Sequence, residues 1–241
     1  MKLHRSAQPT AFLSRFFPNE FIGRHLYLTG EYERSIVEIL LKFSKPGDVL
    51  LDIGANIGYV SACFLNKVPR SRVIAVEPQP QIVDILRSNL KSFGDERYTV
   101  FPVGVSDIDS SGWLEICDWN RGASKVVKER SSQSVEIELW SARRFFASIR
   151  GENVDLVKID VEGHEEIVLK ACEAELNSLR PRAILFENQT RSAAPDGAIG
   201  RILRNIGYQV SGVKKSFMKL DLVPVSTAAD CVYNDYLAVR V

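Results

Sequence analysis

The segment "LLDIGANIGYVS", Leu50 to Ser61, decides the fold. An apolar run ends in Asp52, and a turn containing Gly54 and Gly58 leads into a helical pattern. A strand, a glycine turn and a helix often hold a nucleotide phosphate. Here the dinucleotide pattern G-x-G-x-x-G lacks its second glycine. Asp52 would also face a diphosphate, and like charges at about 4 Å cost about 4 kcal/mol at an effective dielectric near 20. The turn therefore favours a ligand without phosphate over NAD.

Strand and helix patterns alternate on both sides of this segment. We predict strands over 48–54, 71–78, 98–107, 154–160, 182–188, 208–213 and 235–241, and helices over 31–43, 57–66, 81–93, 165–179 and 198–206. Such alternation predicts an α/β fold with a doubly wound, mostly parallel seven-stranded sheet. Period-two alternation around 111–140 predicts an antiparallel insertion. We expect one domain over 1–241, with an N-terminal helical extension or lid over 1–45 and a Rossmann-like core over 46–241.

The composition and net charge of the chain indicate which classes of binding partner to expect. The chain of 241 residues is 45% hydrophobic, 25% charged and has a net charge of +1, without a basic block, so no nucleic-acid partner is expected. No apolar run approaches the roughly 18 residues of a membrane span. The four cysteines form no C-x-x-C pair, which opposes a structural zinc site and favours reduced thiols in a cytoplasmic protein: Cys63, Cys117, Cys172 and Cys231. The sequence is compatible with a homo-oligomer.

The predicted strands end in acids. In doubly wound folds the ligand lies outside the carboxyl ends of the strands, where this chain has Asp52, Glu77, Asp107, Asp160 and Glu187. S-adenosylmethionine fits them, because it has no phosphate and carries a cationic sulfonium and an α-ammonium. Glu77, 25 residues after Asp52, stands where a carboxylate accepts ribose hydroxyls. The expected cofactor-binding residues are Asp52, Gly54, Ala55, Asn56, Gly58, Glu77, Pro78, Ser106, Asp107 and Asp160.

A second informative segment is "VKIDVEGHEEIVL", Val157 to Leu169. Lys158 and Asp160 share one side of the predicted strand, and burying such charges without partners is expensive. His164 is the first candidate for a general base, since its intrinsic pKa is near neutral. Asp160 is the second candidate, with Lys158 and Glu162 orienting the pair. In a rival assignment, Asp160, Glu187 and Asn188 hold Mg²⁺.

The ordered set "DIGANIGYVS", "VEP", "VGVSD", "VKIDVEGHE" and "LFE" resembles the FkbM family of S-adenosylmethionine-dependent methyltransferases. The match runs from about Glu31, whose "EYE" looks like a family element, to about Asn188, and K-x-D-x-E-G-x-E is its specific part. The resemblance implies a class I methyltransferase fold and O-methylation of a small molecule such as a sugar or polyketide, with 110–140 deciding the substrate. The alternatives are an NAD-dependent oxidoreductase or epimerase, and a non-catalytic module that binds partner enzymes.

Overall fold

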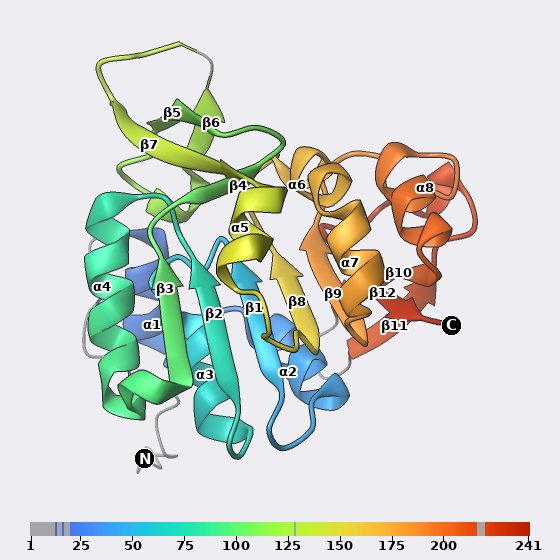
Figure 1. Ribbon diagram of the computed structural model, residues 1–241, viewed down its shortest axis with the longest axis horizontal. Coiled ribbons are helices and arrows are strands. Elements are labelled where there is room, and N and C mark those ends of the chain that lie inside the picture. The colour runs from blue at the N-terminus through green and yellow to red at the C-terminus, as the bar shows by residue number, and fades with distance from the viewer. Residues whose placement is uncertain (1–12, 14–15, 17–19, 128, 216–219) are drawn as a thin grey trace, which may run out of the picture.

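The computed structural model describes residues 13, 16, 20–127, 129–215 and 220–241. An eight-stranded sheet with strand order β11-β10-β12-β9-β8-β1-β2-β3 forms its centre (Figure 1). The strands are β1 (Val49–Ile53), β2 (Arg72–Val76), β3 (Tyr98–Phe101), β8 (Leu156–Ile159), β9 (Ala183–Glu187), β10 (Tyr208–Lys215), β11 (Leu220–Pro224) and β12 (Asp235–Arg240). Strands β3, β2, β1, β8 and β9 are parallel, while β12, β10 and β11 are antiparallel to their neighbours. The predicted fold class is confirmed.

Two details of the sheet differ from the prediction. The sheet has eight strands instead of seven, because β11 adds an antiparallel edge beside β10. The single strand predicted over 98–107 is split in two. Proline cannot donate to a sheet ladder, so β3 ends at Phe101, before Pro102, and β4 (Gly104–Ser106) pairs in a different sheet.

Helices cover both faces of the large sheet (Figure 1). On one face pack α1 (Phe21–Thr29), α2 (Arg34–Phe43), α3 (Tyr59–Lys67) and α4 (Pro80–Leu90). On the other pack α5 (Ala142–Ser148), α6 (Glu165–Ala171), α7 (Glu173–Leu179) and α8 (Ala198–Asn205). Strands β1 and β8 are buried along their whole length because both faces are covered. The helix predicted over 165–179 is two helices that meet at Cys172.

Short 3₁₀ turns complete the regular structure at Lys91–Phe93, Asp95–Arg97, Arg121–Ala123 and Ala228–Asp230. No helix of the described residues is both long and apolar enough to cross a membrane. Of the predicted N-terminal extension, the part before Glu20 lies outside the described residues, apart from Leu13 and Phe16.

A small second sheet stands over the carboxyl ends of the large one (Figure 1). Its order is β4-β7-β5-β6, with β5 (Ser110–Glu115), β6 (Lys125–Val127) and β7 (Ser134–Ser141). Strand β5 is antiparallel to both β6 and β7, as predicted for the insertion, whereas β4 is parallel to β7. Leu114, Ile137 and Leu139 form a separate hydrophobic core in the small sheet. The insertion is thus a separate small layer above the site.

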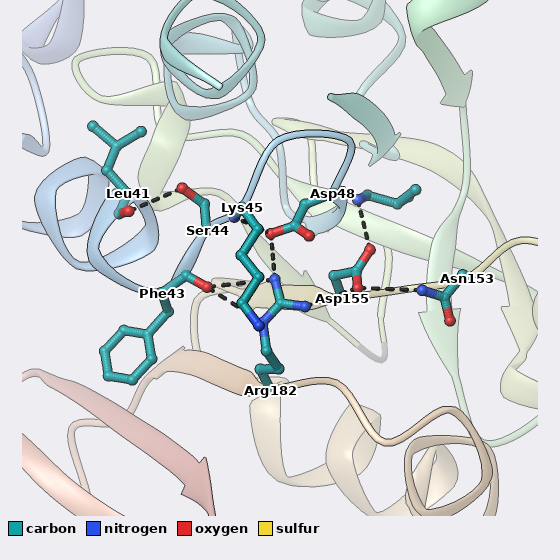
Figure 2. A network of polar contacts seen from close by, with 9 residues as sticks. Leu41, Phe43, Ser44, Lys45, Asp48, Asn153, Asp155 and Arg182 are labelled. Carbon is teal, nitrogen blue, oxygen red and sulfur yellow. Dashed lines mark hydrogen bonds and ion pairs between the residues drawn. The ribbon is translucent and has the colours of Figure 1, made fainter. Parts of the chain in front are cut away.

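The opposite end of the large sheet is held by an ionic network around Arg182 (Figure 2). Arg182 pairs with Asp48, before β1, and with Asp155, before β8, where the distance from Nη1 to Oδ1 is 3.0 Å. It also donates to the carbonyl oxygen of Phe43 at the end of α2. Asp155 accepts the backbone N–H of Val49 as well. One guanidinium therefore ties together the amino ends of β1, β8 and β9.

Candidate active site

A cavity of about 540 Å³ opens at the carboxyl ends of β1, β2 and β8, beneath the small sheet. This volume lies in the range of roughly 300–1,000 Å³ that small-molecule sites usually have. Six predicted cofactor-binding residues line it: Gly54, Ala55, Asn56, Glu77, Pro78 and Asp160. The four predicted catalytic residues line it too: Lys158, Asp160, Glu162 and His164. The topology thus brings together segments that are more than a hundred residues apart.

The glycine turn shapes the floor of this cavity. Gly54 has φ +82°, and its backbone lies so close to β8 that an added Cβ would stand 1.8 Å from the carbonyl oxygen of Asp160. The N–H groups of Gly54 and Ala55 both donate to the carbonyl oxygen of Val76, at 2.9 and 3.0 Å. Gly58 begins α3 and faces Leu86 instead of the cavity. Gly54 and Ala55 therefore face the cavity and can contact a ligand, whereas Gly58 allows the close packing of a helix.

Glu77 lies at the end of β2 with a nearly buried carboxylate. One oxygen accepts the N–H of Asn56 at 3.0 Å, and the other accepts the N–H of Gln79 at 2.9 Å. Burial raises the pKa of Glu77 to about 7, although the two backbone N–H donors oppose that shift. The carboxylate is held rigidly at the cavity wall, where its remaining lone pairs can accept ligand hydroxyls.

Asp52 lies behind the cavity wall. Its side chain is fully buried, it accepts the hydroxyl of Ser61 at 2.6 Å, and its Oδ1 is 3.6 Å from the Lys158 ammonium. It is not among the residues that line the cavity, so its carboxylate lies behind the surface that a cofactor would touch. Asp52 acts on the site through Lys158.

Lys158 is the buried cation of the site. Its ammonium lies 3.1 Å from Asp160 Oδ2 and donates to the carbonyl oxygen of Gly54 at 3.3 Å. Burial disfavours its charge, but Asp160, Asp52 and Glu33 outweigh burial and raise the pKa of Lys158 well above its usual value. Lys158 is therefore charged at neutral pH, and its ion pair orients Asp160.

Glu33 is a site residue that sequence reasoning missed. It precedes α2, lines the cavity, and has a pKa raised to about 8 by burial and by its neighbours Asp160 and Asp52, with Lys158 opposing the shift. Its backbone is left-handed, with φ +46°, as are those of Asn56 at +50° and Glu162 at +53°. Such conformations are costly for non-glycine residues and concentrate at functional sites. The only sequence signal for Glu33 was its place in the "EYE" element that begins at Glu31.

Three carboxylates meet beside Lys158. One ligand oxygen each from Asp160, Glu162 and Glu187 lies within 4.8 Å of the others. Burial and the nearby Asp160 raise the pKa of Glu162 to about 7 and that of Glu187 to about 8. The side-chain oxygen of Asn188, named in the magnesium alternative, accepts the N–H and the hydroxyl of Thr190. Burial and the neighbouring negative charge thus favour the protonated forms of Glu162 and Glu187.

His164 lies on the cavity wall just before α6. Its Nε2 is 3.2 Å from the hydroxyl oxygen of Ser106, and that hydroxyl is placed to donate to Asp107 at 3.1 Å. Because the Ser106 hydroxyl donates its proton to Asp107, the Ser106 oxygen accepts a hydrogen bond from His164. Nε2 of His164 therefore carries the ring proton, and Nδ1 is the basic nitrogen. Burial lowers the pKa of His164, with Asp107 opposing, so the ring is neutral at pH 7. Ser106 and Asp107 themselves lie outside the lining, where Val103, Gly104 and Val105 stand instead.

The parallel sheet with its cavity at the strand ends defines a Rossmann-like fold of the class I methyltransferase type. The methyltransferase FkbM domain matches residues 52–210, and the chain belongs to this family and is a methyltransferase. It is 31% identical over 175 residues to the hexuronic acid methyltransferase AglP of Haloferax volcanii, covering 72% of this chain and 70% of AglP. It is 28% identical over 163 residues to the 2-O-methyltransferase NoeI of Sinorhizobium fredii, covering 61% and 65%.

Two further matches are more distant. The AMB antimetabolite synthetase AmbE of Pseudomonas aeruginosa is 25% identical over 233 residues, which covers 80% of this chain but only 11% of AmbE. Among solved structures, a protein of the NADB-Rossmann superfamily from Streptococcus agalactiae has a TM-score of 0.50 at 11% identity, covering 87% of this chain and 69% of that one. This likeness concerns the fold alone.

Proposed function

We propose that this methyltransferase uses S-adenosylmethionine to methylate a hydroxyl group of a small molecule. The observation that carries the proposal is the charge of the cavity. Among the described residues of its lining, the lysines Lys158 and Lys215 are both ion-paired, with Asp160 and Asp235, and no arginine is present. A diphosphate would find no available cation there, whereas a cationic cofactor would find several carboxylates.

The chain's residues suit that cofactor along the whole cavity. The rigid carboxylate of Glu77 can accept two ribose hydroxyls, and the turn at Gly54 lets the backbone approach closely. The carboxylates of Glu33 and Asp160 can attract the cationic methionine part. When bound, the cofactor supplies an activated methyl group on a sulfonium.

The same residues can handle the acceptor's proton. Holding the hydroxyl oxygen about 3–3.5 Å from the methyl carbon and in line supplies much of the rate. His164 is neutral and can take the proton at Nδ1, and Lys158 keeps Asp160 oriented as the alternative base. A positioned base contributes roughly 10²–10⁴-fold. The names of the relatives AglP and NoeI, a hexuronic acid methyltransferase and a 2-O-methyltransferase, support a hydroxyl acceptor.

Ligand binding tests the cofactor. We expect S-adenosylhomocysteine at 100 times its Kd to raise the free energy of unfolding by about 2.7 kcal/mol, measured as a thermal shift, while NAD produces no shift. Glu77→Gln should weaken this binding, because a neutral amide accepts hydroxyls less strongly than a carboxylate. Glu152→Gln, on the surface beside Arg72, is the matched control. Stabilisation by NAD alone would refute the proposal, and binding without methyl transfer would favour a non-catalytic module.

Replacing His164 tests the base. His164→Ala should lower kcat by roughly 10²–10⁴-fold and leave the Kd of S-adenosylhomocysteine within about twofold. In the wild type, activity should fall as the pH drops through the lowered pKa of His164, because the protonated ring cannot accept a proton. Unchanged turnover in His164→Ala, with a loss in Asp160→Asn, would transfer the role to Asp160. Activity abolished by a chelator would instead support a metal at Asp160, Glu162 and Glu187.

A further inference from the structure

One group of the proposed cofactor has no cation to bind it in the cavity. S-adenosylmethionine ends in an amino acid, whose α-carbon carries both an ammonium and a carboxylate. The ammonium can meet the carboxylates of Glu33 and Asp160. For the carboxylate, the described residues of the lining offer two lysines, Lys158 and Lys215, which are both ion-paired already, and no arginine. The cofactor's carboxylate therefore depends on neutral hydrogen-bond donors.

Tyr32 offers such a donor directly beside Glu33. The two residues are consecutive in the chain, and both line the cavity. Successive side chains of an extended chain point to opposite sides, but the backbone of Glu33 is left-handed, with φ +46° and ψ +36°. A hydroxyl and a carboxylate thus stand side by side at one wall. This pair complements the neighbouring carboxylate and ammonium of an amino acid.

Aromatic contacts hold the ring of Tyr32 at the start of α3. Its centroid lies 6.1 Å from that of Tyr59, with 81° between the ring planes, and 6.1 Å from that of His25, with 73°. Such edge-to-face pairs are favourable. Tyr59 is the first residue of α3, and Ile57, Tyr59 and Val60 line the cavity as well. Since the first N–H groups of a helix lack partners within it and favour an anion, the ring stands next to a suitable place for a carboxylate.

The hydroxyl of Tyr32 is protonated and available. Within the described part of the chain, no residue forms a hydrogen bond with it. Burial raises the pKa of Tyr32, the negative charges of Glu33 and Asp160 raise it further, and Lys158 opposes the shift. The phenol is therefore a neutral donor at physiological pH. A hydrogen bond to a charged acceptor is one of the stronger kinds that such a donor can form.

Two amide side chains of the lining belong to a different part of the cavity. Asn56 and Gln79 are fixed beside Glu77, because their backbone N–H groups donate to its carboxylate. Glu77 is the expected partner of the ribose, so these amides lie near the nucleoside. Tyr32 instead lies close enough to Asp160 for that charge to shift its pKa. Its hydroxyl is thus on the side of the cavity where the methionine part is expected.

We propose that Tyr32 is a cofactor-binding residue whose hydroxyl donates a hydrogen bond to the α-carboxylate of S-adenosylmethionine. The segment before β1 would then hold the amino-acid end of the cofactor, while the glycine turn and Glu77 hold the nucleoside. The inference deepens the proposed function and depends on it.

The experiment compares two ligands that differ only in this carboxylate. They are S-adenosylhomocysteine and its decarboxylated analogue S-adenosyl-3-thiopropylamine, and calorimetry gives the Kd of each for the full chain. We expect Tyr32→Phe to weaken S-adenosylhomocysteine at least about tenfold, because a hydrogen bond to a charged group is lost. The same variant should bind the decarboxylated analogue within about twofold of the wild type. An equal loss for both ligands would overturn the proposal.

The controls separate this role from folding and from catalysis. Tyr32→Phe keeps the ring and its edge contacts, so it should fold. Tyr98→Phe, which removes a surface hydroxyl that donates to Asp95, is the matched control and should change neither affinity. A lower kcat in Tyr32→Phe with an unchanged Kd of S-adenosylhomocysteine would assign the hydroxyl to the acceptor and overturn the proposal. Failure of S-adenosylhomocysteine to bind the wild type would refute the cofactor proposal itself.

Discussion

A Gly54→Ala variant is expected to lose about 4 kcal/mol or more of its free energy of unfolding, and thus most of its folded population. The added Cβ would stand 1.8 Å from the carbonyl oxygen and 2.8 Å from the carbonyl carbon of Asp160. Both atoms belong to the backbone next to β8, so no side-chain rotation can relieve the overlap. Urea unfolding followed by circular dichroism measures the loss.

Gly151→Ala is the matched control for this substitution. Gly151 has φ +95°, close to the +82° of Gly54, but no atom lies within 4 Å of its added Cβ. Only the left-handed conformation is then penalised, by about 1–2 kcal/mol. If both variants lost the same stability, backbone conformation and not the close approach to Asp160 would explain the glycine at position 54.

A Lys158→Met variant is expected to lose about 3–5 kcal/mol of stability at neutral pH, because it leaves the carboxylates around it without their cation. Asp52 is completely buried, and Asp160 and Glu33 are close to the same ammonium. Protonation of Glu33, whose pKa burial already raises to about 8 while Lys158 opposes the shift, would relieve part of the repulsion in the folded state. The variant should therefore gain stability as the pH falls and lose it as the pH rises, opposite to the usual behaviour of paired acids. Urea unfolding at several pH values measures this slope.

Arg182→Met is the control for Lys158→Met. Arg182 also bridges two carboxylates, but at the other end of the sheet (Figure 2). Both variants should be destabilised, yet only Lys158→Met should lose methyl transfer, by about 10²-fold or more, because Asp160 is no longer oriented. Comparable transfer rates in the two variants, measured where both are folded, would show that Lys158 serves stability alone.

The fold could be predicted from the sequence because its signals are local. The apolar runs of the central strands, the glycine turn at Gly54 and the acids at strand ends each occupy a few consecutive residues. Pro102 is a signal in the sequence that one strand ends there. The prediction of a single strand over 98–107 overlooked it, because the residues on both sides of Pro102 are apolar. Strand β11 is a short edge strand with partly buried residues, and its pattern is correspondingly weak.

The parts of the site that could not be predicted depend on register and on backbone direction. Asp52 and Lys158 are register partners across β1 and β8, a pairing that no sequence pattern specifies, and of the two only Lys158 lines the cavity. Glu162 has a left-handed backbone and lies beside Asp160 and Glu187, which the spacing of the sequence does not indicate. Glu33, which precedes β1 in the chain, also has a left-handed backbone and also lines the cavity.

The small sheet has a consequence for protein engineering. Ser106 and Ser141 are register partners in the parallel pairing of β4 with β7, so the chain leaves for residues 107–140 and returns from them at adjacent points. Segments whose two ends lie side by side are the ones that proteins exchange with least disturbance. We therefore expect residues 107–140 to be exchangeable between relatives as one unit, and Lys125, which lines a small cavity together with residues that follow β8 and β9, would move with it.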